Sequence, residues 1–254
     1  MTSPRYPQRV RNDLRFRELD VLRVERVNAG FQRIVLGGEA LEGFSSRGFD
    51  DHTKVFFPAP GTTFVPPVVT EEGIDWGEGV RPQARDYTPL FDAEHNELVL
   101  DFFVHDGGVA SRWALEAKVG DKLTIGGPRG SLVVPEDYAW QLYVCDESGM
   151  PALRRRLETI ASLKVRPEIH AVVTVGDASY KTYLANLSGF NITWIVGHSE
   201  QAVADQLAAL TVPAEDYFIW LTGEGKVVKN LSRRFETDAI DQQLVRASAY
   251  WHAK

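Results

Sequence analysis

The chain has 254 residues, 44% hydrophobic and 25% charged, which is enough to bury a sizeable core as one large or two ordinary domains. Its net charge of −7 at pH 7 argues against nucleic acid as a partner, because the chain as a whole has no basic field. The only cysteine, Cys145, excludes internal disulfides and cysteine-ligated iron–sulfur clusters, and the histidines show no spacing typical of metal ligands. A polar start and the lack of a long apolar run predict a cytoplasmic protein with no membrane segment.

Short strands separated by tight turns are predicted through the front half of the chain. We expect them at residues 19–27, 31–36, 52–57, 97–104 and 123–125. A long loop rich in proline and glycine is expected at 59–83, and a short helix at 111–118. This pattern predicts a small antiparallel β barrel.

Strands alternate with helices after about residue 138. Strands are expected at 140–145, 169–175, 192–196 and 217–222, and helices at 151–163, 182–187, 200–210, 225–237 and 239–247. Such alternation is typical of a parallel sheet covered by helices. The sequence therefore predicts two domains, a β barrel over residues 1–135 and an α/β unit over 136–254.

The stretch Arg85-Asp86-Tyr87-Thr88 lies just before the strand at 97–104. On an extended segment Arg85 and Tyr87 point to the same side, because side chains alternate. The guanidinium suits a diphosphate, the phenol ring suits a flat ligand, and the Thr88 hydroxyl suits a polar ring edge. A flavin dinucleotide offers all three targets; a strand with a solvated arginine and a packed tyrosine is the alternative.

Three other turns have residues that suit an anionic or flat ligand. The glycine loop 106–111 exposes backbone N–H groups at a helix start, although it also fits a plain strand–helix turn. Asp146 and Glu147 follow the first strand of the α/β unit, where parallel sheets bind nucleotides, but acids there also complement a helix dipole. The turn 222–226 precedes basic residues at helical spacing, which fit a solvated face or an anion-binding face.

These residues and several further motifs, in this order, resemble the siderophore-interacting proteins, which are FAD-dependent ferric-siderophore reductases related to ferredoxin reductases. The resemblance runs along nearly the whole chain. It is carried by Asp51-His52-Thr53-Lys54 before Phe57-Pro58, Arg85-x-Tyr87-Thr88, Asp101-Phe102-Phe103-Val104-His105, Gly108-x-Ala110-x-x-Trp113-Ala114, Gly120-Asp121, Gly127-Pro128, Asp146-Glu147 with Pro151-Ala152, Trp220 with Gly223-Glu224, and Tyr250-Trp251.

The resemblance implies an antiparallel FAD-binding barrel followed by a ferredoxin reductase-like domain that admits NADPH or NADH. It implies catalytic roles for Thr88, near flavin N5, and for His105, which would border the flavin. The residues expected to bind FAD or NAD(P)H are Arg85, Asp86, Tyr87, Thr88, His105, Gly108, Val109, Ala110, Ser111, Asp146, Glu147, Gly223, Glu224 and Trp251.

The chain departs from the family pattern at three positions. Leu90 stands where the motif usually continues to a second arginine, which removes a cation near the FAD. Val109 replaces the usual proline, and Cys145 stands where glycine is more common. We interpret the thiol as a packing group, because no cationic neighbour in the sequence would activate it.

The implied reaction passes a hydride from NAD(P)H to flavin N5 and then single electrons to a ferric siderophore, which releases Fe(II) for iron acquisition. A ferric chelate often carries negative charge, so we expect its binding residues among Lys54, Arg112, Lys226, Lys229 and Arg233. A flavin reductase with a protein or free-flavin acceptor, and a non-catalytic siderophore-binding protein, are alternatives. Ser179 and Lys181 favour NADPH, whereas Asp177 favours NADH.

Overall fold

The computed structural model describes residues 5–59, 61–62, 64–78 and 81–253. The chain divides into two compact units. One comprises residues 9–132, and the other combines the residues up to Gln8 with those from Val133 onward. The predicted boundary between residues 135 and 136 stays a prediction. Within the described residues, no helix is both long and apolar enough to cross a bilayer.

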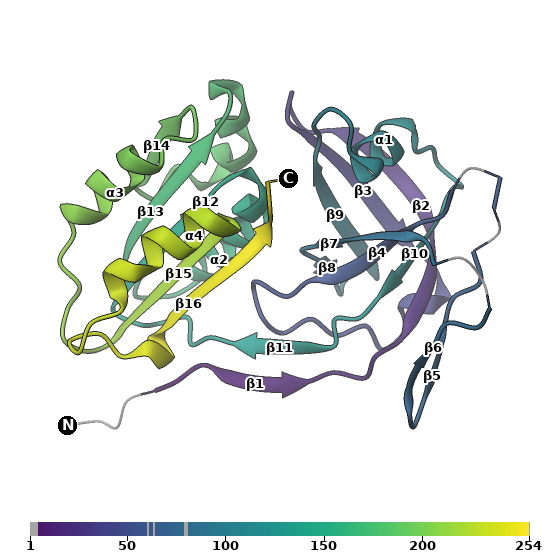
Figure 1. Cartoon of the computed structure of the whole chain (residues 1–254), viewed down its shortest axis with the longest axis horizontal. Coiled ribbons are helices and arrows are strands. Elements are labelled where there is room, and N and C mark those ends of the chain that lie inside the picture. The colour runs from purple at the N-terminus through teal and green to yellow at the C-terminus, as the bar shows by residue number, and fades with distance from the viewer. Residues whose placement is uncertain (1–4, 60, 63, 79–80, 254) are drawn as a thin grey trace. The chain divides into compact units, whose positions relative to one another are not determined.

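The unit of residues 9–132 is built on a seven-stranded sheet with the order β7-β4-β10-β2-β3-β9-β8 (Figure 1). Every neighbouring pair is antiparallel. The strands are β2 (Phe16–Arg26), β3 (Phe31–Gly37), β4 (Thr53–Phe57), β7 (Gln83–Tyr87), β8 (Leu90–Asp92), β9 (Glu97–Phe103) and β10 (Lys122–Gly126). The ring of Tyr87, on one edge strand, lies 4.2 Å from that of Phe102, beside the opposite edge. The sheet is therefore curled into a half-barrel, and the predicted antiparallel β fold of this part is confirmed.

Alternation along β9 shows how the sequence lines this half-barrel. Leu98, Leu100 and Phe102 are fully buried and face the core. Each such side chain contributes about 1.5–3 kcal/mol relative to exposure. Asp101, on the opposite face, accepts two hydrogen bonds from Arg33 of β3, at 2.7 and 2.8 Å. This bidentate ion pair fixes the register of β3 against β9.

The loop predicted at 59–83 contains regular structure. Its described part includes a two-stranded hairpin of β5 (Val68–Thr70) and β6 (Gly73–Asp75). Aromatic rings anchor the excursion: Trp76 lies 6.2 Å from Phe16 and 5.7 Å from Phe56, ring to ring. Gly126 lies beneath those two phenylalanines, and a Cβ at that position would come within 2.9 Å of the Phe16 ring. Positions 60, 63, 79 and 80 of the predicted loop lie outside the described residues.

Three smaller elements complete this part of the chain. They are a 3-10 turn, η1 (Glu39–Leu41), the helix α1 (Val109–Glu116), and a two-stranded pairing of β1 (Gln8–Arg11) with β11 (Gly130–Val133), whose residues Gln8 and Val133 belong to the other unit. The helix α1 begins two residues earlier than predicted, because Gly108 serves as its N-cap.

The other unit is a five-stranded sheet with the order β14-β13-β12-β15-β16, parallel throughout. Its strands are β12 (Trp140–Cys145), β13 (Glu168–Val175), β14 (Ile192–Val196), β15 (Tyr217–Glu224) and β16 (Val245–Trp251). Figure 1 shows helices on both faces of the sheet. They are η2 (Glu147–Gly149), α2 (Met150–Ala161), η3 (Ala178–Leu187), α3 (Glu200–Ala208), α4 (Gly225–Ser232), η4 (Arg233–Phe235) and η5 (Gln242–Leu244). This α/β layering confirms the predicted parallel sheet.

The helix predicted at 239–247 is wrong. Residues 242–244 form a single 3-10 turn, and the chain then enters β16, a fifth strand. Alanine and arginine in this stretch favour a helix locally. Pairing of β16 with β15, from Ile219 opposite Val245 onward, overrides that preference.

A buried arginine ties the start of this sheet to the chain that leads into it. Arg156 of α2 is only 2% exposed. Its guanidinium donates to the carbonyl oxygens of Val134 and Pro135 at 3.1 and 2.6 Å. It also donates to Gln141 Oε1 at 3.1 Å and to the Tyr143 hydroxyl at 2.7 Å. Removal of this side chain would leave several buried acceptors without a donor.

We therefore expect Arg156→Ala to lower the free energy of unfolding by about 2–4 kcal/mol, measured by chemical denaturation. Glu158→Gln on the same helix is the matched control, because it removes only an exposed pair with Arg154. That control should cost less than about 1 kcal/mol. Equal losses for the two variants would contradict a stabilising role for the buried network.

Candidate functional site

The motif predicted to hold a diphosphate lies on β7, at the edge of the half-barrel. Arg85 is exposed, and its guanidinium donates to its neighbour's backbone, Ala84 O, at 2.7 Å. A longer contact of 3.5 Å reaches Gln83 Oε1. Within the described residues no carboxylate lies within 4.0 Å of it. The charge of Arg85 is thus available to an anion from outside the chain.

Tyr87 and Thr88 follow on the same segment, at the point where it meets β9. The Tyr87 ring packs against Phe102, and burial raises the pKa of its phenol. Phe102 in turn lies 5.8 Å from Trp113 of α1, ring to ring. This chain of rings joins β7 to β9 and α1. Thr88 is 7% exposed, and its hydroxyl has no hydrogen-bond partner among the residues that the structure describes.

His105, Gly108 and Ser111 form one compact turn between β9 and α1. The His105 N–H donates to Ser111 Oγ at 3.1 Å, and Ser111 is buried. His105 Nδ1 lies 3.1 Å from Asp106 O, and since a carbonyl oxygen only accepts, Nδ1 is the donor of this contact. A Cβ at position 108 would lie 2.8 Å from the His105 ring, so only glycine leaves the ring in this position.

The first turn of α1, at Val109 and Ala110, has no side-chain cap. Its first backbone N–H groups have no intrahelical partner, which makes them donors for an anion. Leu90, at the start of β8, is half-buried and pairs with Val99. It continues the sheet where the family motif has a cation.

In the α/β unit, Asp146, Gly223 and Trp251 come together although the sequence separates them widely. Trp251 Nε1 donates to Asp146 Oδ2 at 2.7 Å, and Ser148 donates to Asp146 Oδ1 through its N–H at 2.9 Å and through its hydroxyl. Burial raises the pKa of Asp146. Gly223 has a φ of +139° and lies against this carboxylate. A Cβ at position 223 would lie only 2.7 Å from Asp146 Oδ2.

Glu147 is buried at the same edge of the sheet, with 3% of its surface exposed. Its Oε1 accepts the Gly176 N–H at 2.6 Å, and its Oε2 contacts His198 Nε2 at 2.7 Å. Gly176 follows β13 and His198 follows β14, so this carboxylate joins three strand ends. His198 was not among the residues that the sequence indicated, although its place directly after a strand and a glycine was a usable signal.

Glu224 caps α4. One oxygen accepts the N–H groups of Lys226 and Val227 at 2.8 and 3.0 Å, and these bonds, that of Val227 foremost, lower the pKa of the carboxyl. The glutamate therefore organises the helix start. Buried Cys145 precedes this edge on β12, and burial raises the pKa of its thiol well above the usual range.

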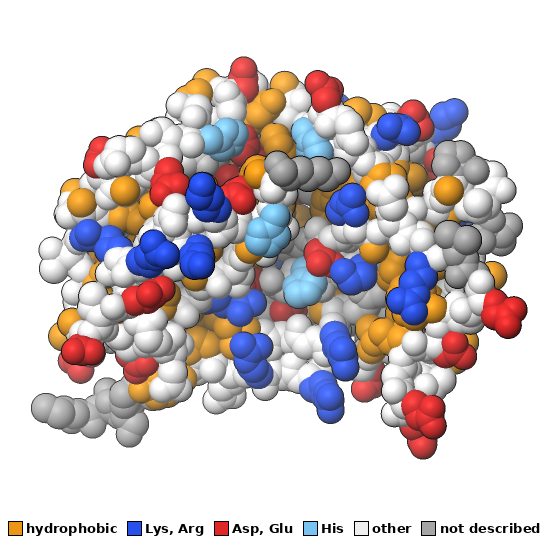
Figure 2. All heavy atoms as spheres, viewed as in Figure 1, with side chains coloured by type: hydrophobic (Ala, Val, Ile, Leu, Met, Phe, Trp, Pro, Cys, Tyr) orange, Lys and Arg blue, Asp and Glu red, His pale blue; other side chains and the backbone are white. Residues whose placement is uncertain are grey.

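The predicted substrate cations do not form one cluster. Lys54 binds Asp86 across β4 and β7 at 2.7 Å, so these two predicted site residues neutralise each other. Arg112 is exposed on α1. Lys226, Lys229 and Arg233 lie on successive turns at α4 and η4, and blue side chains gather over α4 in Figure 2. All three are exposed and have no acidic partner among the described residues.

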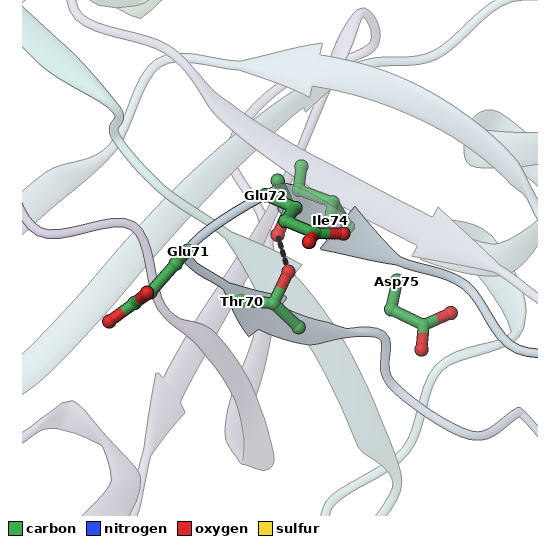
Figure 3. Close-up of a pocket in the computed structure, with 6 residues that line it drawn as sticks. Thr70, Glu71, Glu72, Ile74 and Asp75 are labelled. Carbon is green, nitrogen blue, oxygen red and sulfur yellow. Dashed lines mark hydrogen bonds between the residues drawn. The ribbon is translucent and has the colours of Figure 1, made fainter.

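Among the residues that the structure describes, no group of three or more side chains could hold a metal ion. The hollow in Figure 3 is an open surface feature lined by the β5–β6 hairpin alone, residues 70–75. Thr70 Oγ1 donates to Gly73 O across the turn at 3.1 Å, and the carboxylates of Glu71 and Asp75 point apart. None of the predicted site residues lines it.

Family models match both halves of the chain. A siderophore-interacting FAD-binding domain matches residues 20–132, and a siderophore-interacting protein domain matches residues 138–254. The chain belongs to the siderophore-interacting protein family. The resemblance seen in its motifs is confirmed.

Relatives cover nearly the whole of this siderophore-interacting protein. It is 71% identical over 252 residues, 99% of each chain, to an NADPH-dependent ferric-chelate reductase of Escherichia coli (strain K12). It is 30% identical over 244 residues, 92% of this chain and 89% of the other, to the ferric vibriobactin reductase ViuB of Vibrio cholerae. The crystal structure of a siderophore utilization protein from T. fusca is 31% identical with a TM-score of 0.85, covering 97% and 96% of the two chains.

More distant likenesses show the fold alone. The flavohem-like FAD/NAD-binding domain of a nitric oxide dioxygenase from Vibrio cholerae is 15% identical, with a TM-score of 0.66 over 93% of this chain and 99% of that one. The predicted ferredoxin reductase-like architecture of the siderophore-interacting protein is thereby confirmed.

The half-buried carboxyl of Asp146 provides a testable titration. We expect it to titrate above its ordinary value of 3.8 in carboxyl-carbon NMR. Because Trp251 stabilises the ionised form, Trp251→Phe should raise the midpoint further. Asp177 is an internal control, since hydrogen bonds from the Ser179 side chain and then its N–H lower the pKa of the Asp177 carboxyl below 3.8.

The sign of the stability effect follows from the direction of the shift. The folded state holds the Asp146 proton more tightly than the unfolded chain does. The contribution of this group to the free energy of unfolding is therefore full below pH 3.8 and falls as the pH rises through the folded pKa. A midpoint at or below 3.8 would contradict the desolvated position of the carboxyl.

Proposed function

We propose that this protein is an FAD-dependent, NADPH-dependent ferric-chelate reductase that takes electrons from NADPH and reduces a ferric siderophore to release Fe(II). The proposal rests on the Arg85 guanidinium and the backbone N–H groups at the start of α1, which have no acidic partner among the described residues. They belong to a chain that is 71% identical to an NADPH-dependent ferric-chelate reductase. The alignment with that relative covers 99% of each chain.

The chemical groups of the half-barrel residues are those that FAD binding needs. Arg85 offers a guanidinium without an acidic partner among the described residues, and Thr88 offers a free hydroxyl. Val109 to Ser111 offer N–H groups at a helix start, and Gly108 leaves room for the His105 ring beside this turn. We assign Arg85 and the α1 turn to the diphosphate, and Tyr87, Thr88 and His105 to the ring system.

When bound, FAD supplies the conversion between a two-electron donor and a one-electron acceptor. This chain's own contribution is binding and orientation. His105 directs Nδ1 at Asp106 O, which leaves Nε2 to hold or move a proton at the edge of the site. Tyr87 remains neutral, because burial raises the pKa of its phenol.

NADPH is assigned to the carboxyl edge of the parallel sheet, where open α/β sheets bind nucleotides. Asp146, Gly223, Glu224 and Trp251 line the turns at that edge. We propose that cationic side chains attract an anionic ferric chelate, namely Lys54, Arg112, Lys226, Lys229 and Arg233. Of these, Lys54 is paired with Asp86.

Reduction weakens the hold of hard anionic oxygens on iron, because Fe(II) carries less charge than Fe(III). The reaction fits a reducing compartment, and the single cysteine is a free thiol. We therefore also propose a cytoplasmic location.

Loss of the guanidinium should weaken FAD binding. We expect Arg85→Ala to lower FAD affinity by roughly 10- to 100-fold, the worth of a charge-assisted contact, in a flavin-fluorescence titration of the apoprotein. Arg23→Ala is the matched control, because Arg23 is an exposed β2 arginine paired with Glu97. Unchanged FAD affinity in Arg85→Ala would contradict the assignment of the diphosphate.

The reaction is tested by anaerobic mixing of the yellow holoprotein with NADPH, a ferric catecholate or hydroxamate siderophore, and a ferrous trap. One NADPH carries two electrons and each ferric ion accepts one, so we expect about two trapped Fe(II) per NADPH oxidised. Transfer to a carrier protein in place of the chelate would favour an electron-transfer flavoprotein. Binding of the siderophore without oxidation of NADPH would favour a sequestering protein.

A further inference from the structure

The buried carboxylate of Glu147 leads to a histidine at the surface. Glu147 is 3% exposed, whereas half of the His198 side chain is exposed, and 2.7 Å separates Oε2 from Nε2. Because an ionised carboxylate only accepts hydrogen bonds, Nε2 carries a proton. The other ring nitrogen, Nδ1, has no hydrogen-bond partner among the described residues. The pair therefore holds the ring at Nε2 and leaves Nδ1 for a ligand.

The backbone around His198 shows that this position is specified. His198 has a φ of +49° and follows Gly197 at +101°, in the left-handed region that favours glycine. A histidine in this conformation is strained, and its bond to Glu147 offsets the strain. Gly197 N donates to Val175 O at 2.8 Å, which joins the turn after β14 to the end of β13.

The ring also packs directly on the turn that follows β13. A Cβ at Gly176 would lie 3.2 Å from His198 Cε1, so the imidazole occupies the space that a side chain would take. The same turn continues through Asp177 to Lys181. Glu147 holds both sides of the arrangement, since its Oε1 accepts the Gly176 N–H at 2.6 Å.

The turn after the second strand of a dinucleotide-binding sheet meets the adenosine ribose, where an acid selects a free 2′-hydroxyl and a cation accommodates a 2′-phosphate. In this sheet β13 follows β12 in sequence and pairs with it. The Asp177 carboxylate accepts the Ser179 N–H at 2.7 Å within its own turn. With Nε2 held by Glu147, Nδ1 of His198 is the ring atom left for a phosphate oxygen or its hydroxyl beside this turn.

We propose that His198, held by the buried Glu147, is a specificity-determining residue that binds the 2′-phosphate of NADPH. The assignment rests on the proposed function and deepens it, because it names the group that distinguishes NADPH from NADH. Glu147 is then a positioning residue that acts through His198 and Gly176, since its own carboxylate is spent inside the protein.

The test is calorimetric titration of the FAD-loaded protein with NADP⁺ and, separately, NAD⁺. We expect His198→Ala to weaken NADP⁺ binding about tenfold or more, the worth of a charge-assisted hydrogen bond. NAD⁺ affinity should stay within about twofold, because NAD⁺ lacks the phosphate. Binding is measured without a ferric chelate, so the result does not depend on turnover.

The positioning role is tested with Glu147→Gln, which keeps an acceptor for the Gly176 N–H but removes the charge behind the ring. We expect a smaller loss of NADP⁺ affinity than in His198→Ala. The double variant should bind NADP⁺ no more weakly than His198→Ala alone, because both changes act through one contact. Additive losses would contradict action through His198, and thermal melts of each variant identify any that fails to fold.

The control is His170→Ala. His170 is also paired with a glutamate, Glu168, at 2.7 Å, but near the opposite end of β13. The His170→Ala substitution should change the affinity for neither NADP⁺ nor NAD⁺. A wild-type preference for NADP⁺ in His198→Ala would overturn the inference and leave the proposed function intact. A wild-type protein that binds neither dinucleotide would contradict the proposed function itself.

Discussion

Strands of a parallel sheet all end at the same edge, and this constraint assembles the candidate nucleotide site. The turns after β12, β13, β14, β15 and β16 lie far apart in sequence but meet at one side of the sheet. Hydrogen bonds then cross between them. The Asp146 carboxylate accepts a hydrogen bond from Trp251 at the end of β16. The Glu147 carboxylate bonds Gly176 and His198, which follow β13 and β14. Without parallel pairing, none of these contacts would form.

The two units treat their charged groups in opposite ways. In the α/β unit Asp146 and Glu147 accept hydrogen bonds from other groups of the protein, because a carboxylate removed from water is unfavourable unless it is hydrogen-bonded. In the half-barrel the donors of the Arg85 segment and the α1 turn are left without acidic partners among the described residues. The hydrogen-bonded acids fix the geometry of their turns, whereas the donors without acidic partners are available for an anionic ligand.

Glycine has the same role at three of these turns. His105 lies over Gly108, His198 lies over Gly176, and the Asp146 carboxylate lies against Gly223. In each case a functional side chain occupies the space where a Cβ would be. Gly223 also needs a positive φ, but Gly108 and Gly176 do not, so close approach is the reason for glycine at those two positions.

The sequence by itself determined the half-barrel, the parallel sheet and the family, because alternation, strand–helix order and motif order are local properties. It also located the Arg85 segment and the acids after β12. Only the tertiary structure decided that residues 245–251 form a strand, since pairing with β15 outweighs their helix preference. It alone paired Lys54 with Asp86 and joined Glu147 to His198, 51 residues away, because contacts between distant residues depend on strand order and register.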